Sequence, residues 1–308
     1  MKILIINFSG TGHTTLCGDY IGEAFQETGH EVTRLVVKKD MDNNIDYNQF
    51  DLIGFGYPIH AFNPPQFFNN FIEKLPKVEN KKYFFFKVSG EPFHLNDASS
   101  YHMFKKLKKK GFNLIAEKHF LMPYNIMFRY RDSIAKQMYL YLKPLTKAFV
   151  LGIENNEPET IKYRLGHKIL SFFLRIEWIA PFVNSPFIKV NRKKCINCLR
   201  CWRECPTKAV SINKKGVIKV KATKCAMCMR CAMYCPTDAF TYGFMNPWKV
   251  NKPFNYQAIV KNKEIEPEYI NHDTKGYFKK FNKYFDEQKE LLKKYNIPNP
   301  IEEYNKGK

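Results

Sequence analysis

The chain has 308 residues, of which 44% are hydrophobic, and its 50 Lys and Arg residues against 29 Asp and Glu residues give a net charge of +21. This length allows about two domains with ordinary hydrophobic cores. No apolar run approaches the roughly 20 residues that span a bilayer, and the N-terminus lacks a signal-peptide cleavage site, so we expect neither a transmembrane segment nor a secreted protein.

The first element is predicted to be a buried strand that leads into a phosphate-binding loop. Residues 2–8 form a continuous apolar run, typical of a parallel strand covered on both faces. A helix predicted from apolar spacing follows the loop and ends at Gly29. Backbone N–H groups at a helix N-terminus bind anions, and hydroxyl groups suit a phosphate monoester. The loop consists of Ser9, Gly10, Thr11, Gly12, His13 and Thr14, without the Gly-Lys-Ser/Thr of a Walker loop.

Strands and helices are then predicted to alternate as far as residue 121. The expected strands cover residues 31–37, 50–56, 82–88 and 113–121, and the expected helices cover residues 64–75 and 98–110. This alternation predicts an α/β domain over residues 1–150, with a five-stranded, doubly wound parallel sheet. Ligands of such sheets bind beyond the carboxyl ends of the strands, so residues 9–14, 56–63 and 89–92 are the candidate loops.

Residues 1–150 resemble a flavodoxin, because Ser9, Thr11, Gly12 and Thr14 match the S/T-x-T-G-x-T phosphate loop of that family. The resemblance implies that FMN binds there, with its ring between the second and third loops. His13 departs from the family pattern, and the residue that stacks on the ring stays open among Tyr57, His60 and Phe62. The ring contacts implied by the resemblance are Gly56, Tyr57, Pro58, Ile59, His60, Ala61, Phe62, Ser89, Gly90 and Glu91.

A helical linker is expected over residues 151–187. Helical spacing extends over about 131–150 and 158–179, and Pro144 should kink or split the first helix. The second helix carries Leu170, Phe172, Phe173, Leu174 and Trp178. We expect these side chains to form an interdomain core, and a helix lying on a membrane surface is the alternative.

Two copies of one cysteine pattern predict a two-cluster ferredoxin domain over residues 188–243. Each copy reads C-x2-C-x2-C-x3-C-P, the bacterial run that holds [4Fe-4S] clusters, in which the fourth Cys serves the other run's cluster. Zinc sites and disulfide frameworks use other spacings or settings. The pattern assigns one cluster to Cys195, Cys198, Cys201 and Cys235, and the other to Cys225, Cys228, Cys231 and Cys205.

The whole chain resembles flavodoxin–ferredoxin fusions (EFR-family ferredoxins), through the phosphate loop, the double cysteine run and the weakly specific segment 273–278. Cysteines committed to clusters favour the reducing cytoplasm. The excess of Lys and Arg is read first as solvated surface and second as attraction to an acidic redox partner or an anionic membrane. Formation of a homodimer is possible from the sequence, and binding of nucleic acid is not expected. For the C-terminal extension over residues 244–308 we predict no chemical role.

An electron carrier is the first functional hypothesis, because a flavin stores two electrons and the clusters pass one at a time. The second is a flavoenzyme that reduces a small substrate, with His60, Glu91 or Tyr57 as proton donor. A redox sensor bound to a membrane or nucleic acid is the third. A covered flavin cavity would favour the carrier, and an open one the enzyme.

Overall fold

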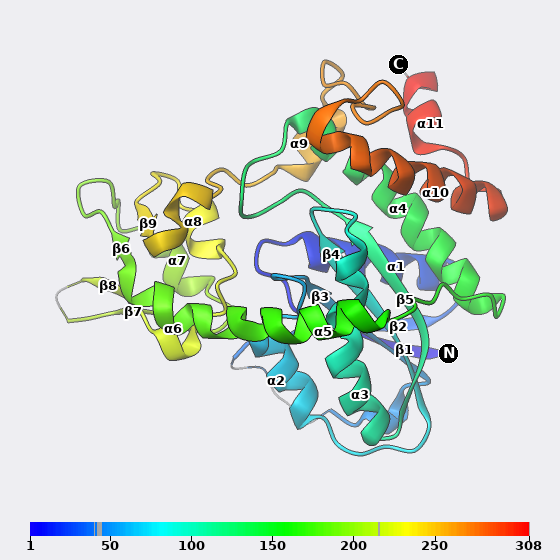
Figure 1. Ribbon diagram of the computed structural model, residues 1–308, viewed down its shortest axis with the longest axis horizontal. Helices are drawn as coiled ribbons and strands as arrows, with labels where there is room; N and C mark the ends of the chain where they lie inside the picture. Colours follow the sequence, from blue (N-terminus) through cyan, green and yellow to red (C-terminus); the bar gives the residue numbers. More distant parts are fainter. Residues whose placement is uncertain (40, 42–44, 215, 308) are drawn as a thin grey trace.

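Five parallel strands form the central sheet of the computed structural model, which describes residues 1–39, 41, 45–214 and 216–307 (Figure 1). The strand order is β2-β1-β3-β4-β5, which confirms the predicted doubly wound α/β sheet. The strands are β1 (Lys2–Asn7), β2 (Glu31–Val36), β3 (Leu52–Pro58), β4 (Lys81–Ser89) and β5 (Phe112–Leu121).

Alternating side chains of the strands pack against helices on both faces of the sheet. Ile3 and Ile5 point into one core, and Leu4 and Ile6 into the other, because successive strand residues face opposite ways. The first core lies under α1 (His13–Glu27) and α4 (Asp132–Glu154), the second under α2 (Gln66–Lys74) and α3 (Tyr101–Lys109). The inner strands β1, β3 and β4 are therefore largely buried on both faces, as the apolar run of residues 2–8 predicted for the first of them, whereas the edge strand β2 is mostly exposed or half-buried.

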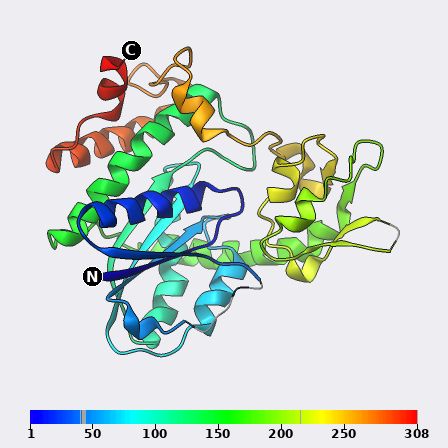
Figure 2. The same cartoon turned by 180° about the vertical axis from the view of Figure 1, so that it is seen from behind.

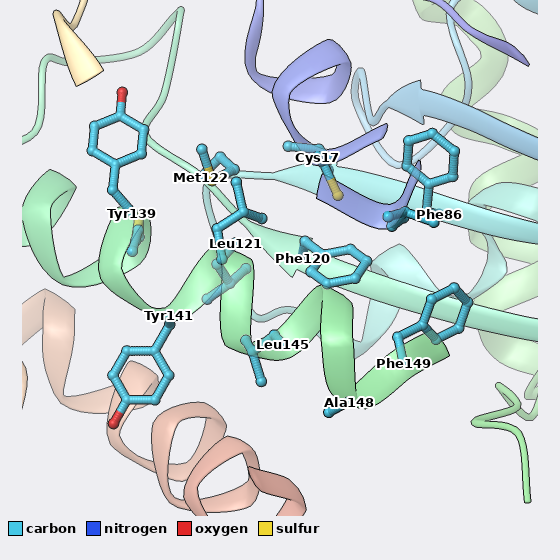
Figure 3. Packing of buried hydrophobic residues seen from close by; sticks show 14 of the residues in the cluster. Cys17, Phe86, Phe120, Leu121, Met122, Tyr139, Tyr141, Leu145, Ala148 and Phe149 are labelled. Carbon is cyan, nitrogen blue, oxygen red and sulfur yellow. The ribbon is translucent and has the colours of Figure 1, made fainter. Parts of the chain in front are cut away.

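The C-terminal extension completes the first core. It contains α9 (Tyr256–Lys261), α10 (Phe281–Lys294) and α11 (Pro300–Lys306), which contact α4. Phe281, Phe285 and Leu292 are buried there. Figure 3 shows Tyr139, Leu145 and Phe149 of α4 among the side chains of this core. Pro144 lies inside α4, which continues through it as one helix, so a split is excluded and the alternative of a kink stays a prediction.

The cysteine-rich domain is a second, smaller unit at one end of the molecule (Figure 2). Its strands pair antiparallel as β6 with β9 and β7 with β8, and one short helix contains the third cysteine of each run. The elements are β6 (Ile188–Val190), α7 (Arg200–Arg203), β7 (Val210–Ile212), β8 (Ile218–Val220), α8 (Arg230–Met233) and β9 (Phe240–Tyr242).

A helical segment connects the two units. It contains α5 (Leu165–Phe173), a 3-10 stretch (Leu174–Ile179), α6 (Ala180–Asn184) and a further 3-10 turn (Ser185–Phe187). Figure 1 shows it as a nearly continuous rod across the front of both units. Leu170, Phe172 and Phe173 are 45%, 60% and 67% exposed, so the expected interdomain core at these positions is wrong. Within the described part of the chain, every helix is too short or too polar to cross a bilayer.

Shorter 3-10 helices complete the element order. They cover Tyr47–Gln49, His94–Ser100, Ala222–Lys224, Gly243–Trp248 and Gly276–Lys280.

Candidate functional site

A cavity of about 380 Å³ lies at the carboxyl ends of the strands, where the three candidate loops meet. Ser9 and Thr14, which lie at the two ends of the predicted phosphate loop, both line this cavity. The other predicted residues that line the cavity are Gly10, Thr11, His13, Pro58, Ile59, His60, Ala61, Phe62, Ser89, Gly90 and Glu91. The fold therefore brings together residues up to 82 positions apart.

The first loop is shaped to bind an anion. Gly12 has the left-handed backbone (φ 109°) that ends the loop, and α1 begins at the next residue. The Gly12 N–H donates to Ser9 Oγ at 3.0 Å, which closes the loop. Ser9, Thr11 and Thr14 are buried. Since the first-turn N–H groups of α1 have no acceptor within the helix, they are free to bind phosphate.

Two residues predicted from the second loop do not line the cavity. Tyr57 is fully buried in the core, where its ring stacks on Phe68 and its hydroxyl lies 3.0 Å from Ser99 Oγ. It is therefore not the stacking residue, because its side chain occupies the face of the sheet covered by α2 and α3. Gly56 makes room for the ring of Phe86, since an added Cβ would lie 2.0 Å from it.

The two histidines of the cavity are held neutral at pH 7. Burial lowers the pKa of His13 to about 4, with the backbone of Pro123 acting in the opposite direction. The His13 Nε2 lies 2.8 Å from the Tyr139 hydroxyl, which fixes the ring against α4. Burial also lowers the pKa of His60 to about 4. Neither ring therefore adds a positive charge to the cavity near neutral pH.

Glu91 is paired with a lysine from the C-terminal extension. Lys280 Nζ lies 2.9 Å from Glu91 Oε1 and 4.0 Å from the centre of the Phe93 ring, and the two residues are 189 positions apart. Glu91 and Phe93 both line the cavity. The extension thus reaches residues that line the cavity, a contribution that local sequence patterns did not indicate.

The segment after β5 forms another wall that sequence reasoning did not assign to the site. Met122, Pro123, Tyr124, Asn125, Ile126 and Met127 all line the cavity. Tyr124 packs so closely over Gly90 that an added Cβ there would lie 2.2 Å from its ring. The position of this segment at the carboxyl end of β5 was the available signal, because strand ends meet at the site.

The eight cysteines form two groups, each drawn from both runs. Burial raises the pKa of Cys201 to about 11, with Cys198, Cys195 and Cys235 adding to the rise. Burial raises the pKa of Cys228 to about 12, with Cys225 and Cys205 adding to it. Cys235 thus lies with the first run and Cys205 with the second, the arrangement that the predicted crossed ligation requires; ligation itself stays a prediction.

The two runs share a backbone conformation that turns each loop around its cysteines. Left-handed φ angles occur at Asn197, Leu199 and Lys208, and again 30 positions later at Met227, Met229 and Asp238. The Cys205 and Cys235 sulfurs each accept the N–H of the residue four positions on, both at 3.2 Å. Such N–H donors stabilise thiolates bound to iron. The residues present therefore fit two clusters.

A single metal ion fits the cysteines less well. Among the described residues, His, Cys, Asp and Glu side chains form no group of three or more that would hold one ion. A four-iron cluster holds its four thiolates around a cube, which separates them more than one ion does. A small cavity is lined by Cys195, Cys198, Cys201 and Cys235 together with apolar side chains.

The phosphate loop and the second cysteine run are in direct contact. The Arg230 guanidinium donates to the Gly10 carbonyl at 2.8 Å, and the Tyr234 hydroxyl donates to the Thr11 carbonyl at 2.6 Å. Met227 and Met229, on either side of Cys228, line the cavity. The cysteine-rich unit therefore forms part of the wall of this cavity.

Family models match both units. A flavodoxin domain model matches residues 4–131, and a 4Fe-4S dicluster domain model matches residues 194–239. A comparison with curated proteins finds no match. The cofactors are therefore FMN in the first unit and [4Fe-4S] clusters in the second.

Solved flavodoxins resemble the first unit. Flavodoxin 1 from Bacillus cereus is 20% identical, with 39% of this chain and 86% of that chain covered and a TM-score of 0.34. A short-chain flavodoxin associated with a PDU bacterial microcompartment is 14% identical, with 51% and 99% covered and a TM-score of 0.38. From the two family matches, the chain is a flavodoxin–ferredoxin fusion.

Proposed function

We propose that the chain is an electron carrier in which the cluster of Cys205, Cys225, Cys228 and Cys231 is the neighbour of the flavin. The observation that carries the proposal is the contact between Gly10 and Cys228, which leaves no room for a Cβ on residue 10. FMN supplies electron storage in two separable steps, and the clusters supply one-electron transfer. The flavin loop and the cluster loop belong to one chain, so transfer between them needs no second copy.

The cluster site of Cys195, Cys198, Cys201 and Cys235 is the proposed contact point for a protein partner. Cys198 is exposed, and Ile196 and Trp202 beside it are 62% and 44% exposed. Arg192, Lys193 and Lys194 are also exposed and precede the first ligand. A surface that combines exposed apolar side chains with basic residues suits an acidic redox protein, because opposite charges steer association.

The chemistry of the cavity favours a carrier over a flavoenzyme. A general acid works best with a pKa near the operating pH. His13 and His60 both have a pKa lowered to about 4 by burial, and Glu91 is paired with Lys280. Residues 122–127, which follow β5, line the cavity together with Met227, Met229 and Met245 of the cluster unit.

Anaerobic purification followed by quantitation of iron, sulfide and FMN tests the cofactor content. We expect about eight irons and one FMN per chain, and zinc in place of iron would contradict the proposal. The reduced protein should then reduce an acidic ferredoxin at a rate that falls as salt rises. Saturable oxidation by a small quinone or nitro compound, with no reaction towards the ferredoxin, would favour the flavoenzyme instead.

A further inference from the structure

Most of the large apolar side chains of the connecting segment point outward, whereas Ser171, Asn184 and Ser185 point inward beside Pro181. In α5, the one buried residue is Ser171, whose hydroxyl lies 3.0 Å from Asn63 Oδ1. In the following turns, Asn184 and Ser185 are 3% and 1% exposed, and the Asn184 amide donates to the Tyr242 carbonyl at 3.2 Å. Hydrogen bonds therefore hold this segment to the protein, whereas most surface helices are held by an apolar stripe that packs on the core.

The outward side chains form what we call the α5–α6 face. Leu165, Phe172 and Phe173 of α5 are 70%, 60% and 67% exposed, and Phe182 and Val183 of α6 are 52% and 56% exposed. The face continues onto Phe244, which is 62% exposed and whose ring centre lies 4.7 Å from that of Phe187. Exposed apolar side chains are ordinary singly, but a contiguous set marks an interaction surface.

Basic residues accompany this face. Between residues 162 and 189 the sequence contains one acidic residue, Glu177, and five basic ones: Lys162, Arg164, Lys168, Arg175 and Lys189. The Arg175 guanidinium lies 5.3 Å from the centre of the Phe172 ring. Lys168 Nζ lies 4.6 Å from the centre of the Tyr101 ring. Cations at the edge of an apolar surface are the arrangement of helices that lie in the headgroup region of a bilayer.

From these observations we propose that the α5–α6 face binds the surface of an anionic phospholipid bilayer, with its aromatic side chains among the acyl chains and its basic side chains at the headgroups. A second copy of the chain fits this face less well, because pairing it with itself would bring the same basic residues together. Figure 1 shows the connecting segment as a rod along one broad side of the molecule. This position would let the whole segment contact a flat surface. Attachment through this face leaves the electron-carrier proposal unaffected.

The test is co-sedimentation of the cofactor-loaded protein with phospholipid vesicles. We expect binding to vesicles that contain phosphatidylserine, weak binding to pure phosphatidylcholine, and loss of binding at high salt. The double variant Phe173→Gln/Phe182→Gln should weaken binding to the anionic vesicles by about tenfold or more, because two aromatic side chains no longer leave water. The matched control is Tyr277→Gln, an exposed aromatic residue in the C-terminal extension, and should bind like the unmodified protein.

A second pair of variants tests the basic side chains. Lys162→Glu/Arg164→Glu should weaken binding to anionic vesicles more than Lys279→Glu/Lys293→Glu, which makes the same charge change in the C-terminal extension. Unchanged far-ultraviolet circular dichroism and FMN content show that each variant is folded. Equal effects of the two pairs, or no effect of Phe173→Gln/Phe182→Gln, would overturn the proposal by indicating non-specific attraction to net charge. So would concentration-dependent self-association that the phenylalanine variant abolishes, since the face would then bind a second copy.

Discussion

Gly10 of the phosphate loop lies against Cys228 of the second cysteine run. A Cβ added to residue 10 would lie 2.6 Å from the Cys228 Cβ and 2.7 Å from its carbonyl oxygen. Both atoms are fixed by the backbone of the cluster loop, so neither can move aside cheaply. The phosphate loop and the second cysteine run are therefore complementary in shape at Gly10.

Gly10→Ala should weaken the contact between the flavodoxin unit and the ferredoxin unit and so destabilise the protein. Overpacking of a close contact typically costs about 1–3 kcal/mol, so the free energy of unfolding should fall by that amount in urea titrations. The visible circular dichroism of the bound cofactors should change as well. Gly166→Ala is the matched control, because no atom lies within 4 Å of the added Cβ. A Gly10→Ala protein as stable as this control would contradict the contact.

Pairs of cysteine substitutions should reveal the crossed ligation. Cys205→Ala with Cys228→Ala removes two ligands of one cluster and should leave about four irons per chain, whereas Cys205→Ala with Cys198→Ala should leave neither cluster intact. Iron quantitation and electron paramagnetic resonance of the reduced protein distinguish the two results. Cys17→Ala is the control, since Cys17 is buried in α1 and should not affect the iron content. The reverse order of iron contents would show that each run serves its own cluster.

Lys280→Gln should lower the flavin potential. The substitution removes a positive charge 2.9 Å from Glu91 Oε1 and leaves that carboxylate unpaired beside the cavity. Adding an electron there becomes harder, and a half-exposed pair of this kind should shift the potential by roughly 20–60 mV. An anaerobic redox titration measures the shift. Lys279→Gln removes the same charge from an exposed neighbour and should change the flavin potential much less. Equal shifts in the two variants would show that the pairing of Lys280 with Glu91 does not cause the change.

Acid should destabilise the protein through the cavity histidines. Their folded pKa of about 4 lies below the ordinary value of 6.5, so the unfolded chain binds protons first as pH falls. The contribution of the two neutral histidines to the free energy of unfolding is complete above pH 6.5. It is lost between pH 6.5 and 4, by up to about 1.4 kcal/mol per pH unit for each histidine. His60→Gln should flatten the pH dependence of the unfolding midpoint. An unchanged slope would place the acid sensitivity elsewhere.

A buried ion pair beside the third loop gives a stability prediction. Lys87 Nζ lies 2.8 Å from Glu117 Oε1, both side chains are almost fully buried, and the Tyr163 hydroxyl donates to Glu117 Oε2 at 2.6 Å. Glu117→Leu leaves the lysine charge buried without its carboxylate partner, with the Asp97 carbonyl and the Ser100 hydroxyl as neutral acceptors, and should lower the free energy of unfolding by about 3–5 kcal/mol. Lys87→Met/Glu117→Leu should recover part of that loss. A double variant less stable than Glu117→Leu would show that Lys87 has another strong partner.

The sheet could be predicted from the sequence because strands and helices alternate and because inner strands such as β1 and β3 are apolar on both faces. That same property hid the direction of Tyr57, since a strand buried on both sides gives no alternation to separate core from cavity. The phosphate loop could be proposed from the sequence because all of its groups are contiguous. The Glu91–Lys280 pair could not be found, because it joins residues 189 positions apart.

The connecting segment shows a different limit. Helical spacing identified an apolar helix that contains Leu170, Phe172 and Phe173, but it does not say whether these side chains point inward. The inward side was decided by the hydrogen bonds of Ser171 and Asn184 to distant backbone and side-chain groups. Sequence alone assigns apolar stripes to a core because most proteins bury them.

The hydrogen bonds from Arg230 and Tyr234 to the phosphate loop have a thermodynamic consequence for assembly. The carbonyls of Gly10 and Thr11 belong to the peptide units that carry the Thr11 and Gly12 N–H groups, and the Gly12 N–H closes the phosphate loop on Ser9 Oγ. We therefore expect occupancy of one prosthetic group to be coupled to occupancy of the other, and by linkage the coupling would be reciprocal. A chain that has lost the iron and sulfide of its second run should release FMN more readily by the same factor by which FMN loss weakens that run's hold on its iron. The fusion thus favours fully loaded molecules over half-loaded ones.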